Sequence, residues 1–371
     1  MSTTNGKGRI TRRTFLELSS GGLASTGLVG DANSAETLSD QRGNVQTTKS
    51  DAVRTGKIAL EEHFGLPESA NYAGKDLPTP EDRANFFDLG GRRIADMDRG
   101  DLDICILSLG APGVQAVPDI SKAIELSRRA NDFLAENVAK NPKRLKGFAA
   151  LPLQDPQAAV QELTRCVKDL GFSGALVNGF SQISNAESAV FYDLPEYRAF
   201  WAAVQELDVP FYLHPRLPLA TRLQPYEGHP WLAGSPWGFA VETSIHALRL
   251  MGSGLFDEYP RLKIILGHLG EGLPFGIWRV DHRISRGTLR PQAKLPMAHY
   301  LRDFYITTSG NFRSQALTDV ILEIGADRVL YSVDYPFEDV VEAKEWFDQV
   351  AISDSDRVKI ARSNAQRLFH L

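Results

Sequence analysis

The feature that most constrains the fold is an alternation, kept from residue 57 to the C-terminus, between short apolar runs and amphipathic helical segments. Segments such as SKAIELSRRANDFLAENVAK carry apolar residues with the 3.6-residue period of a helix. The apolar runs predict eight strands, near residues 57–63, 102–108, 145–151, 174–178, 210–214, 262–267, 304–308 and 328–332. GALVNG, RLKIILGH and RVLYSVD are almost continuously apolar, as expected of parallel strands covered by helices.

Eight βα units over about 310 residues predict an α/β protein with one (β/α)₈ TIM barrel, whose usual size is about 250 residues before insertions. A doubly wound open sheet is the alternative, but no G-x-G-x-x-G motif follows the first expected strand. The barrel also carries an inserted loop after strand 5, PRLPLATRLQPYEGHPWLAGSPWGF. Loops of that length in a compact domain are usually functional, and the aromatic residues favour a lid or a subunit contact.

Two segments precede the barrel. Residues 1–36 contain TRRTFLEL followed by SSGGLASTGLVG, which resembles a twin-arginine export signal and predicts a periplasmic or secreted protein. The alternative is an amphipathic tail with chance arginines on a cytoplasmic protein. The stretch is too short and too polar to span a bilayer, so no membrane span is expected. Residues 37–56 are polar and lack periodicity, which predicts a linker before a catalytic domain at 57–371.

Composition narrows the classes of partner. The chain is 43% hydrophobic and 23% charged, which is typical of a globular protein with a large core. Its formal net charge is −5, and no Lys/Arg cluster is interleaved with aromatics, so nucleic acid is not an expected partner. Cys105 and Cys166 lie far apart and predict buried thiols, not a metal-binding pair.

Polar side chains stand at the ends of four expected strands. They are Glu61 and His63 after the first strand, His214 after the fifth, His268 after the sixth and Asp334 after the eighth. Active sites of these barrels lie where the strands end and the βα loops begin. We therefore expect these five side chains to meet at one end of the barrel.

The first strand ends in Glu61, Glu62 and His63. Because side chains alternate along a strand, Glu61 and His63 should point to the barrel axis and Glu62 away from it. Together with His214 and Asp334 they form a mixed oxygen and nitrogen set that suits Zn²⁺, Mn²⁺ or Mg²⁺. The alternative is that Glu61 and His63 pair with each other or cap a helix. Convergence of all the groups favours a cation, because unpaired buried charges cost several kcal/mol each.

The motifs ALEEHF, LHPR, GHLGEGLPFxxWRxDHR and SVDYPFE together resemble the metal-dependent, nonoxidative decarboxylases of ortho-hydroxybenzoic acids in the amidohydrolase superfamily. The γ-resorcylate and 2,3-dihydroxybenzoate decarboxylases are members of that group. The resemblance covers residues 57 to 371, and the order and spacing of the motifs make it specific. It implies one divalent metal bound by Glu61, His63, His214 and Asp334, with no organic cofactor.

The same resemblance implies a mechanism. The carboxylate and phenolate of a small aromatic acid chelate the metal, Asp334 protonates the ring carbon, and CO₂ and a phenol are released. His268, oriented by Glu271, relays protons, and Arg279 contacts the substrate. The alternatives are a helix-capping role for His268 and a surface salt bridge of Arg279 with Asp281 or a neighbouring acid. Similar enzymes are homo-oligomers, so we expect a tetramer or a dimer.

Aromatic side chains are candidates for packing on the substrate ring. They are Trp231 and Trp237 of the inserted loop and Phe337 of SVDYPFE. His229 in the loop and His246 in a helical pattern are not expected to bind the metal.

Two other functional classes remain open from the residues alone. One is a metal-dependent hydrolase or lactonase on the same barrel, since a fold does not fix its chemistry. The other is a barrel that binds a metal or ligand without catalysis. Release of CO₂ from dihydroxybenzoates, tested against hydrolysis of esters and lactones, separates the three.

Overall fold

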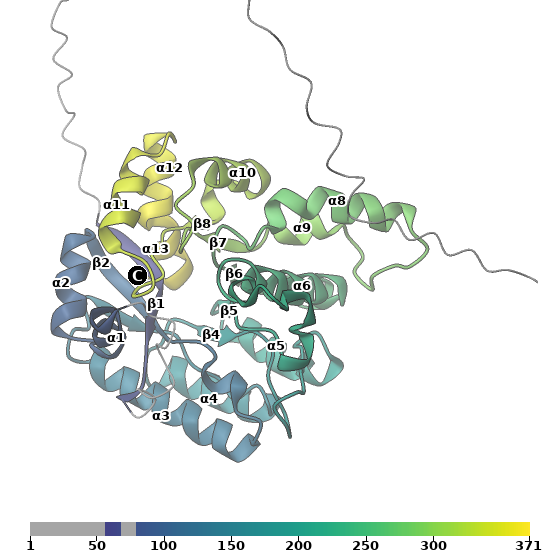
Figure 1. Ribbon diagram of the computed structural model, residues 1–371, viewed down its shortest axis with the longest axis horizontal. Coiled ribbons are helices and arrows are strands. Elements are labelled where there is room, and N and C mark those ends of the chain that lie inside the picture. The colour runs from purple at the N-terminus through teal and green to yellow at the C-terminus, as the bar shows by residue number, and fades with distance from the viewer. Residues whose placement is uncertain (1–55, 68–78) are drawn as a thin grey trace, which may run out of the picture. The chain divides into compact units, whose positions relative to one another are not determined.

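The computed structural model describes residues 56–67 and 79–371, which form the strands and helices shown in Figure 1. The export signal expected at 1–36 and, apart from Gly56, the linker expected at 37–56 lie outside the described residues. Both therefore stay predictions.

All eight expected strands are present. They are β1 (Lys57–Phe64), β2 (Leu102–Leu109), β3 (Leu145–Gly147), β4 (Ala175–Asn178), β5 (Phe211–His214), β6 (Ile264–Leu266), β7 (Tyr305–Thr307) and β8 (Val329–Leu330). The strands pair in parallel in the orders β1-β2-β3 and β4-β5-β6-β7-β8. Parallel bridges between Ala149 and Ala175 and between Glu62 and Tyr335 join these two sheets on both sides. The sheet is therefore closed, as predicted, and the doubly wound alternative is wrong.

Several strands are shorter than predicted. The clearest case is β3, expected at 145–151, which ends at Gly147. Beyond it, the N–H of Phe148 donates to Leu107 on one side and the N–H of Ala149 to Gly174 on the other. Only one parallel bridge, between Ala149 and Ala175, continues this apolar run toward β4.

Helices surround the strands (Figure 1). They are α1 (Pro80–Phe87), α2 (Gly91–Arg99), α3 (Ile120–Val138), α4 (Pro156–Lys168), α5 (Arg198–Glu206), α6 (Gly238–Gly252), α7 (Leu255–Glu258), α8 (Leu273–Arg286), α9 (Met297–Leu301), α10 (Ser314–Ile324), α11 (Val340–Gln349), α12 (Asp354–Val358) and α13 (Asn364–Phe369). Among the described residues, no helix is both long enough and apolar enough to cross a membrane.

Two hydrophobic layers fill the barrel unit. The larger packs the helices against the outer face of the strands and includes both cysteines, which are buried free thiols as predicted. The smaller fills the inside of the barrel with residues such as Ile58, Leu60 and Tyr212. Helix α13 contributes Leu368 and Phe369 to this inner layer. The interior is thus a packed core, and room for chemistry exists only where the strands end.

The loop inserted after β5 contains three short 3₁₀ helices, η4 (Ala220–Arg222), η5 (Gln224–Tyr226) and η6 (Pro230–Leu232), before α6 begins. Trp231 and Trp237 are 63% and 61% exposed. Neither indole belongs to the core of this chain. Their predicted roles, packing on a substrate or contacting a second subunit, stay predictions.

His246, in α6, is a buried structural histidine, as the helical pattern predicted. Its Nε2 accepts a hydrogen bond of 3.2 Å from the backbone N–H of Tyr192. Burial, with a smaller effect of Arg249, lowers the pKa of His246 from 6.5 to about 3. The folded protein therefore keeps this ring neutral at a pH where the unfolded chain protonates it.

The folded state binds fewer protons at His246 than the unfolded state between pH 6.5 and about 3, so stability is lost as the pH falls through that window. We expect His246 to contribute about 2 kcal/mol of destabilisation between pH 7 and pH 5. Urea unfolding of the protein and of His246→Gln at both pH values measures this difference. Exposed His229 is the control, because His229→Gln should keep the parent pH dependence; equal slopes for all three proteins would contradict the assignment.

Candidate metal centre

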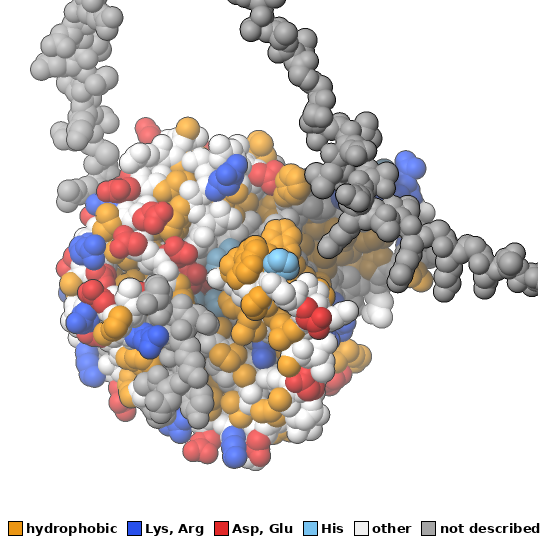
Figure 2. All heavy atoms as spheres, in the orientation of Figure 1, with side chains coloured by type: hydrophobic (Ala, Val, Ile, Leu, Met, Phe, Trp, Pro, Cys, Tyr) orange, Lys and Arg blue, Asp and Glu red, His pale blue; other side chains and the backbone are white. Residues whose placement is uncertain are grey.

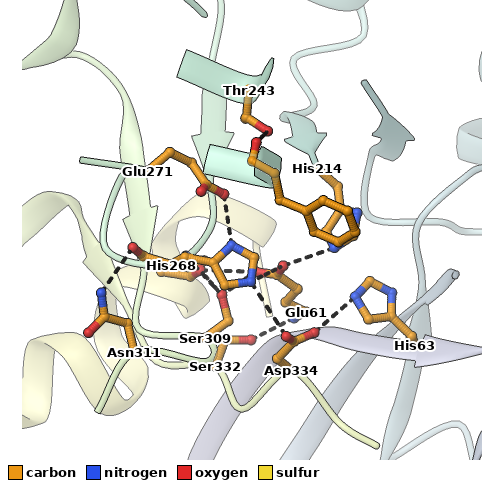
Figure 3. Close-up of polar contacts among 12 residues, drawn as sticks. Glu61, His63, His214, Thr243, His268, Glu271, Ser309, Asn311, Ser332 and Asp334 are labelled. Carbon is orange, nitrogen blue, oxygen red and sulfur yellow. Dashed lines mark hydrogen bonds and ion pairs between the residues drawn. The ribbon is translucent and has the colours of Figure 1, made fainter. Parts of the chain in front are cut away.

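Four side chains gather at the C-terminal ends of the strands (Figure 3). Glu61 and His63 come from β1, His214 ends β5, and Asp334 follows β8. One potential ligand atom from each lies within 4.8 Å of the other three. Glu61, His63 and His214 are buried, whereas Asp334 is partly exposed, so the group opens to solvent on the side of the aspartate. Figure 2 shows histidine atoms near the centre of this face, beside hydrophobic side chains.

A β-bulge in β1 decides which of the three consecutive ionisable residues face the site. Between Ala59 and Glu62 the strand advances three residues while its partner β2 advances two, so β1 carries one extra residue. Leu60 packs in the barrel interior, and Glu61 also points inward. The directions predicted for Glu61, His63 and Glu62 are correct, but simple alternation omitted the bulge.

Ser332 holds this bulge. Its Oγ accepts hydrogen bonds from the backbone N–H groups of both Leu60 (3.1 Å) and Glu61 (2.6 Å), and donates to Oε1 of Glu62 (3.2 Å). Glu62 faces a buried region beside Arg93, and burial raises its pKa to about 8. The outward carboxyl thus helps to close β1 against β8 and takes no part in the metal group.

The residues fit a cation, since two of the candidate ligand atoms are buried without a hydrogen-bond partner among the described residues. These are Oε1 of Glu61 and Nε2 of His63. Oε1 of Glu61 lies 3.2 Å from Nε2 of His214, and Nε2 of His63 lies 3.3 Å from Oδ1 of Asp334. Buried polar atoms are nearly always satisfied, so two adjacent unsatisfied ones indicate a missing partner of positive charge.

The Nδ1 atoms of His63 and His214, which point away from the metal group, each contact a polar partner. Nδ1 of His63 lies 3.1 Å from Oγ of Ser108, and Nδ1 of His214 lies 2.7 Å from Oδ1 of Asn178. An amide oxygen only accepts, so His214 carries its proton on Nδ1 and turns the Nε2 lone pair to the site. Such partners orient metal-binding imidazoles.

The second oxygen of Glu61 is surrounded by hydroxyl groups. Tyr212, Thr307 and Ser309 each donate a hydrogen bond to Oε2, that of Thr307 being 3.2 Å long. We call these three residues the hydroxyl cradle. Burial opposes ionisation of Glu61, but His268, His214 and His63 outweigh it and hold the pKa of Glu61 well below its ordinary value. The carboxylate is therefore ionised throughout the neutral range.

The segment after β6 turns left-handed, and this turn pairs His268 with Glu271. Residues 268–272 all have positive φ, between 49° and 82°. In this conformation side chains three residues apart share a face, and Nδ1 of His268 lies 2.7 Å from Oε1 of Glu271. Each non-glycine residue so held costs about 1–2 kcal/mol. The predicted pairing is confirmed, and the helix-capping alternative is wrong, because Gly272 is the N-cap of α8.

His268 connects this pair to Asp334. Its Nε2 lies 3.4 Å from Oδ2 of Asp334, while Oδ1 of Asp334 faces His63. Burial favours the neutral imidazole, but Glu61 and Glu271 outweigh it and raise the pKa of His268 well above its ordinary value. Burial likewise opposes ionisation of Asp334, yet the nearby imidazoles of His268 and His63 lower its pKa. The His268 imidazole thus lies beside the carboxylate that opens to solvent, with its pKa raised by the neighbouring carboxylates.

Two residues shape the mouth of the site: the aromatic Phe337 and Gly310, which has no side chain. Phe337 is 40% exposed, and its ring centroid lies 5.8 Å from that of His63. Gly310 has a φ of +58°, and a Cβ there would stand 3.1 Å from His268 and 3.3 Å from Asp334. The position predicted for Phe337 is compatible with contact to a bound ring.

Arg279 is not part of the group. It is exposed on α8 and makes no hydrogen bond or ion pair with the described residues. The alternative salt bridge is wrong as well, because Asp281 accepts hydrogen bonds from the backbone N–H groups of Met297 (2.7 Å) and Ala298 (2.9 Å). Contact between Arg279 and a substrate stays a prediction.

Sequence reasoning missed the residues that support the ligands. They are Ser108, Asn178, Tyr212, Thr307, Ser309 and Ser332. All six are uncharged polar residues near the C-terminal ends of strands. An example is TTSGN, which begins at the last residue of β7. Because they lie at the same strand ends as the ligands, their position could have marked them as site residues. The sequence does not show which ligand each of them contacts.

A (β/α)₈ barrel with a mixed carboxylate and imidazole cluster at its C-terminal face defines a class of metal-dependent enzymes. Residues 90–371 match the family model described as amidohydrolase. The chain belongs to this amidohydrolase family.

Curated relatives are similar over almost their whole length. The γ-resorcylate decarboxylase of Rhizobium sp. (strain MTP-10005) is 56% identical over 322 residues, which cover 85% of this chain and 98% of the relative. That of Rhodococcus jostii (strain RHA1) is 54% identical over 325 residues, with 85% and 99% covered.

Two solved structures resemble the barrel closely. A 2,6-dihydroxybenzoate decarboxylase complexed with 2,6-dihydroxybenzoate has a TM-score of 0.83 and 56% identity, covering 85% of this chain and all of the other. A dihydroxybenzoic acid decarboxylase from Polaromonas sp. JS666, with bound manganese and the inhibitor 2-nitroresorcinol, has a TM-score of 0.83, 55% identity and coverages of 85% and 97%. The predicted family, barrel fold and decarboxylating activity are confirmed.

Gly267, directly after β6, leaves the space that Glu61 occupies. A Cβ there would lie 2.8 Å from Oε2 and 3.0 Å from Oε1 of Glu61. We expect Gly267→Ala to displace the carboxylate and weaken Mn²⁺ binding about tenfold or more, which chelator competition measures. Gly276→Ala is the control, because a Cβ on that helix meets nothing within 4 Å. Parent-like Mn²⁺ affinity in Gly267→Ala would show that Glu61 is not a ligand.

Proposed function

We propose that the protein is a metal-dependent carboxy-lyase that converts an ortho-hydroxybenzoic acid, such as 2,6-dihydroxybenzoate (γ-resorcylate), into a phenol and CO₂. The observation that carries the proposal is the combination of two unsatisfied ligand atoms, on Glu61 and His63, with the His268 imidazole that lies 3.4 Å from Asp334 and is paired with Glu271. The unsatisfied atoms supply a cation site, and His268 with Asp334 supplies a path for a proton. The relatives named above carry out this type of reaction on dihydroxybenzoates.

A single divalent ion bound by Glu61, His63, His214 and Asp334 would supply Lewis acidity to the carboxylate and phenolate oxygens of the substrate. Manganese in the Polaromonas relative supports Mn²⁺, with Zn²⁺ and Mg²⁺ as the other ions to test. Histidine and carboxylate ligands accept all three.

Asp334 delivers the proton to the ring carbon that bears the carboxylate. Because its Oδ2 faces His268 at 3.4 Å, it can receive that proton from the imidazolium. Protonation makes the ring carbon tetrahedral, the bond to the carboxylate breaks, and the electron pair restores the aromatic ring. One proton is consumed and CO₂ leaves, so no redox cofactor is required. The reverse reaction at high bicarbonate would carboxylate a phenol.

Glu271 keeps His268 charged and fixed in direction through the 2.7 Å contact to Nδ1. Phe337, beside His63 at the mouth, is placed to flank the ring of the substrate. The structure adds no feature that favours the hydrolase or the non-catalytic alternative.

We also propose export through the twin-arginine segment and assembly into a dimer or tetramer. Support for assembly comes from large apolar side chains on α8, where Phe275 and Trp278 are 87% and 69% exposed. Contiguous exposed apolar side chains can mark a protein–protein contact, and a second copy of this chain is the proposed partner. Arg279, on the same helix, would act on a substrate only in such an assembly or after a movement of α8.

Asp334→Asn should abolish decarboxylation of 2,6-dihydroxybenzoate, with kcat falling about a thousandfold or more, because an amide cannot carry the proton. CO₂ release measures turnover, and circular dichroism checks the fold. Hydrolysis of esters and lactones by the parent protein is assayed in parallel. Residual turnover near the parent rate in Asp334→Asn would remove this residue from the proton path.

His268→Ala should lower kcat by about 10²–10⁴-fold while Mn²⁺ remains bound, since His268 relays protons and is not in the ligand set. Metal content after dialysis separates loss of the relay from loss of the cation. Exposed His229→Ala serves as the control and should behave as the parent. Loss of Mn²⁺ in His268→Ala would instead place His268 among the ligands.

A further inference from the structure

The two oxygens of Glu61 stand in opposite environments. Oε2 accepts hydrogen bonds from the hydroxyl cradle, Tyr212, Thr307 and Ser309, and all four residues are fully buried. Oε1 has no hydrogen-bond partner among the described residues and faces the imidazoles of the site. The carboxylate is thus held by one oxygen and free at the other.

The cradle comes from strands well separated from β1. Tyr212 lies on β5, Thr307 ends β7, and Ser309 follows it two residues later. Each hydroxyl has one proton to donate, and hydrogen bonds to a carboxylate are stronger than those between neutral groups. Gly267 lies against both oxygens of Glu61, so β6 leaves this space to the carboxylate. Turning Oε2 toward the site would break contacts to all three hydroxyls at once.

A carboxylate can bind one cation through one oxygen or through both. Four side chains that each give one atom occupy four positions, and Mn²⁺ or Mg²⁺ prefers six oxygen-type ligands in an octahedron. Two positions then remain for other groups. If Glu61 bound through both oxygens, only one would remain, too few for a ligand that holds the ion at two points.

We propose that the hydroxyl cradle restricts Glu61 to one-oxygen binding and so keeps two positions at the cation open for a substrate that binds through two oxygens. Tyr212, Thr307 and Ser309 are positioning residues in this scheme, acting through Glu61 and not on the substrate. The inference rests on the proposed function, because it explains how the site accepts a carboxylate and a phenolate together.

The hydroxyl cradle could instead only hold Glu61 in place, and this simpler role predicts a different effect of removing the cradle. If the cradle merely supported the carboxylate, its removal would weaken the cation and every ligand bound to it. If it limits Glu61 to one oxygen, its removal should preserve the cation and selectively weaken ligands that need two positions. The two roles are therefore separated by comparing ligands on the same loaded protein.

The variants are Thr307→Val, Ser309→Ala and the double variant. Matched controls are Thr243→Val, which removes a buried hydroxyl bonded to the Phe239 carbonyl, and Ser127→Ala, which removes one bonded to the Ile124 carbonyl. Each control deletes one partly buried hydrogen bond that is not made to the metal group. Thermal unfolding of every protein verifies that the cradle variants fold like their controls.

Mn²⁺ affinity is measured from the spin-resonance signal of the free ion, and the loaded proteins are titrated with acetohydroxamate, which binds metals through two oxygens, and azide, which binds through one atom. For the double variant we expect acetohydroxamate to weaken about tenfold, with azide and Mn²⁺ affinities within about threefold of the parent. The controls should match the parent for all three.

Equal weakening of acetohydroxamate and azide, loss of Mn²⁺, or no change in any affinity would overturn the proposal. If the double variant does not fold, Ser309→Ala alone decides, with an expected loss of about threefold for acetohydroxamate and none for azide. Neither probe is an aromatic acid, so failure of this proposal is distinct from failure of the proposed function, which would appear as absence of CO₂ release from the parent protein.

Discussion

The concentration of buried ionisable groups at one end of the barrel is the constraint on which the rest of the site depends. Glu61, His63 and His214 are enclosed, and Asp334 and His268 complete the group from the side of the opening. A buried charge is tolerated only when it is paired or coordinates a metal. The folded arrangement is therefore suited to binding a cation, and the His268 imidazole lies next to it, beside Asp334. In the proposed mechanism one carboxylate, Asp334, serves both the cation and the proton transfer, and its two oxygens face different partners, His63 and His268.

The backbone brings these groups together by two local departures from regular structure. The bulge in β1 turns Glu61 inward, and Ser332, which follows the neighbouring strand β8, stabilises it. The left-handed turn after β6 brings His268 onto Glu271 at the expense of backbone strain. Strain of this kind persists where the surrounding structure determines it and is common at functional sites. Both departures lie at the C-terminal ends of strands, so the barrel below them keeps its regular packing.

The sequence predicted the strands and the ligand set well because both leave strong local patterns. Apolar runs mark buried parallel strands, and charged residues at their ends cannot be explained by packing. It could not predict the β-bulge, since the extra residue in β1 is defined by the register with β2, and no local pattern of residues records that register. The hydroxyl cradle was missed for a related reason, because Thr307 and Thr308 are adjacent threonines whose roles differ only through distant partners. Sequence patterns give the residues of a site more readily than the hydrogen bonds that orient them.

The barrel closes between its first and last strands, and this seam has a kinetic consequence. The N–H of Asp334 donates to the carbonyl of Glu61, and the N–H of His63 donates to the carbonyl of Tyr335, across more than 270 residues of chain. Contacts so distant in sequence are slow to form, because a long loop must be ordered before they are gained. A folding chain with an open seam would hold the two carboxylates apart and could not coordinate an ion with high affinity. Closure of the seam is therefore required before Glu61 and Asp334 can bind one cation together.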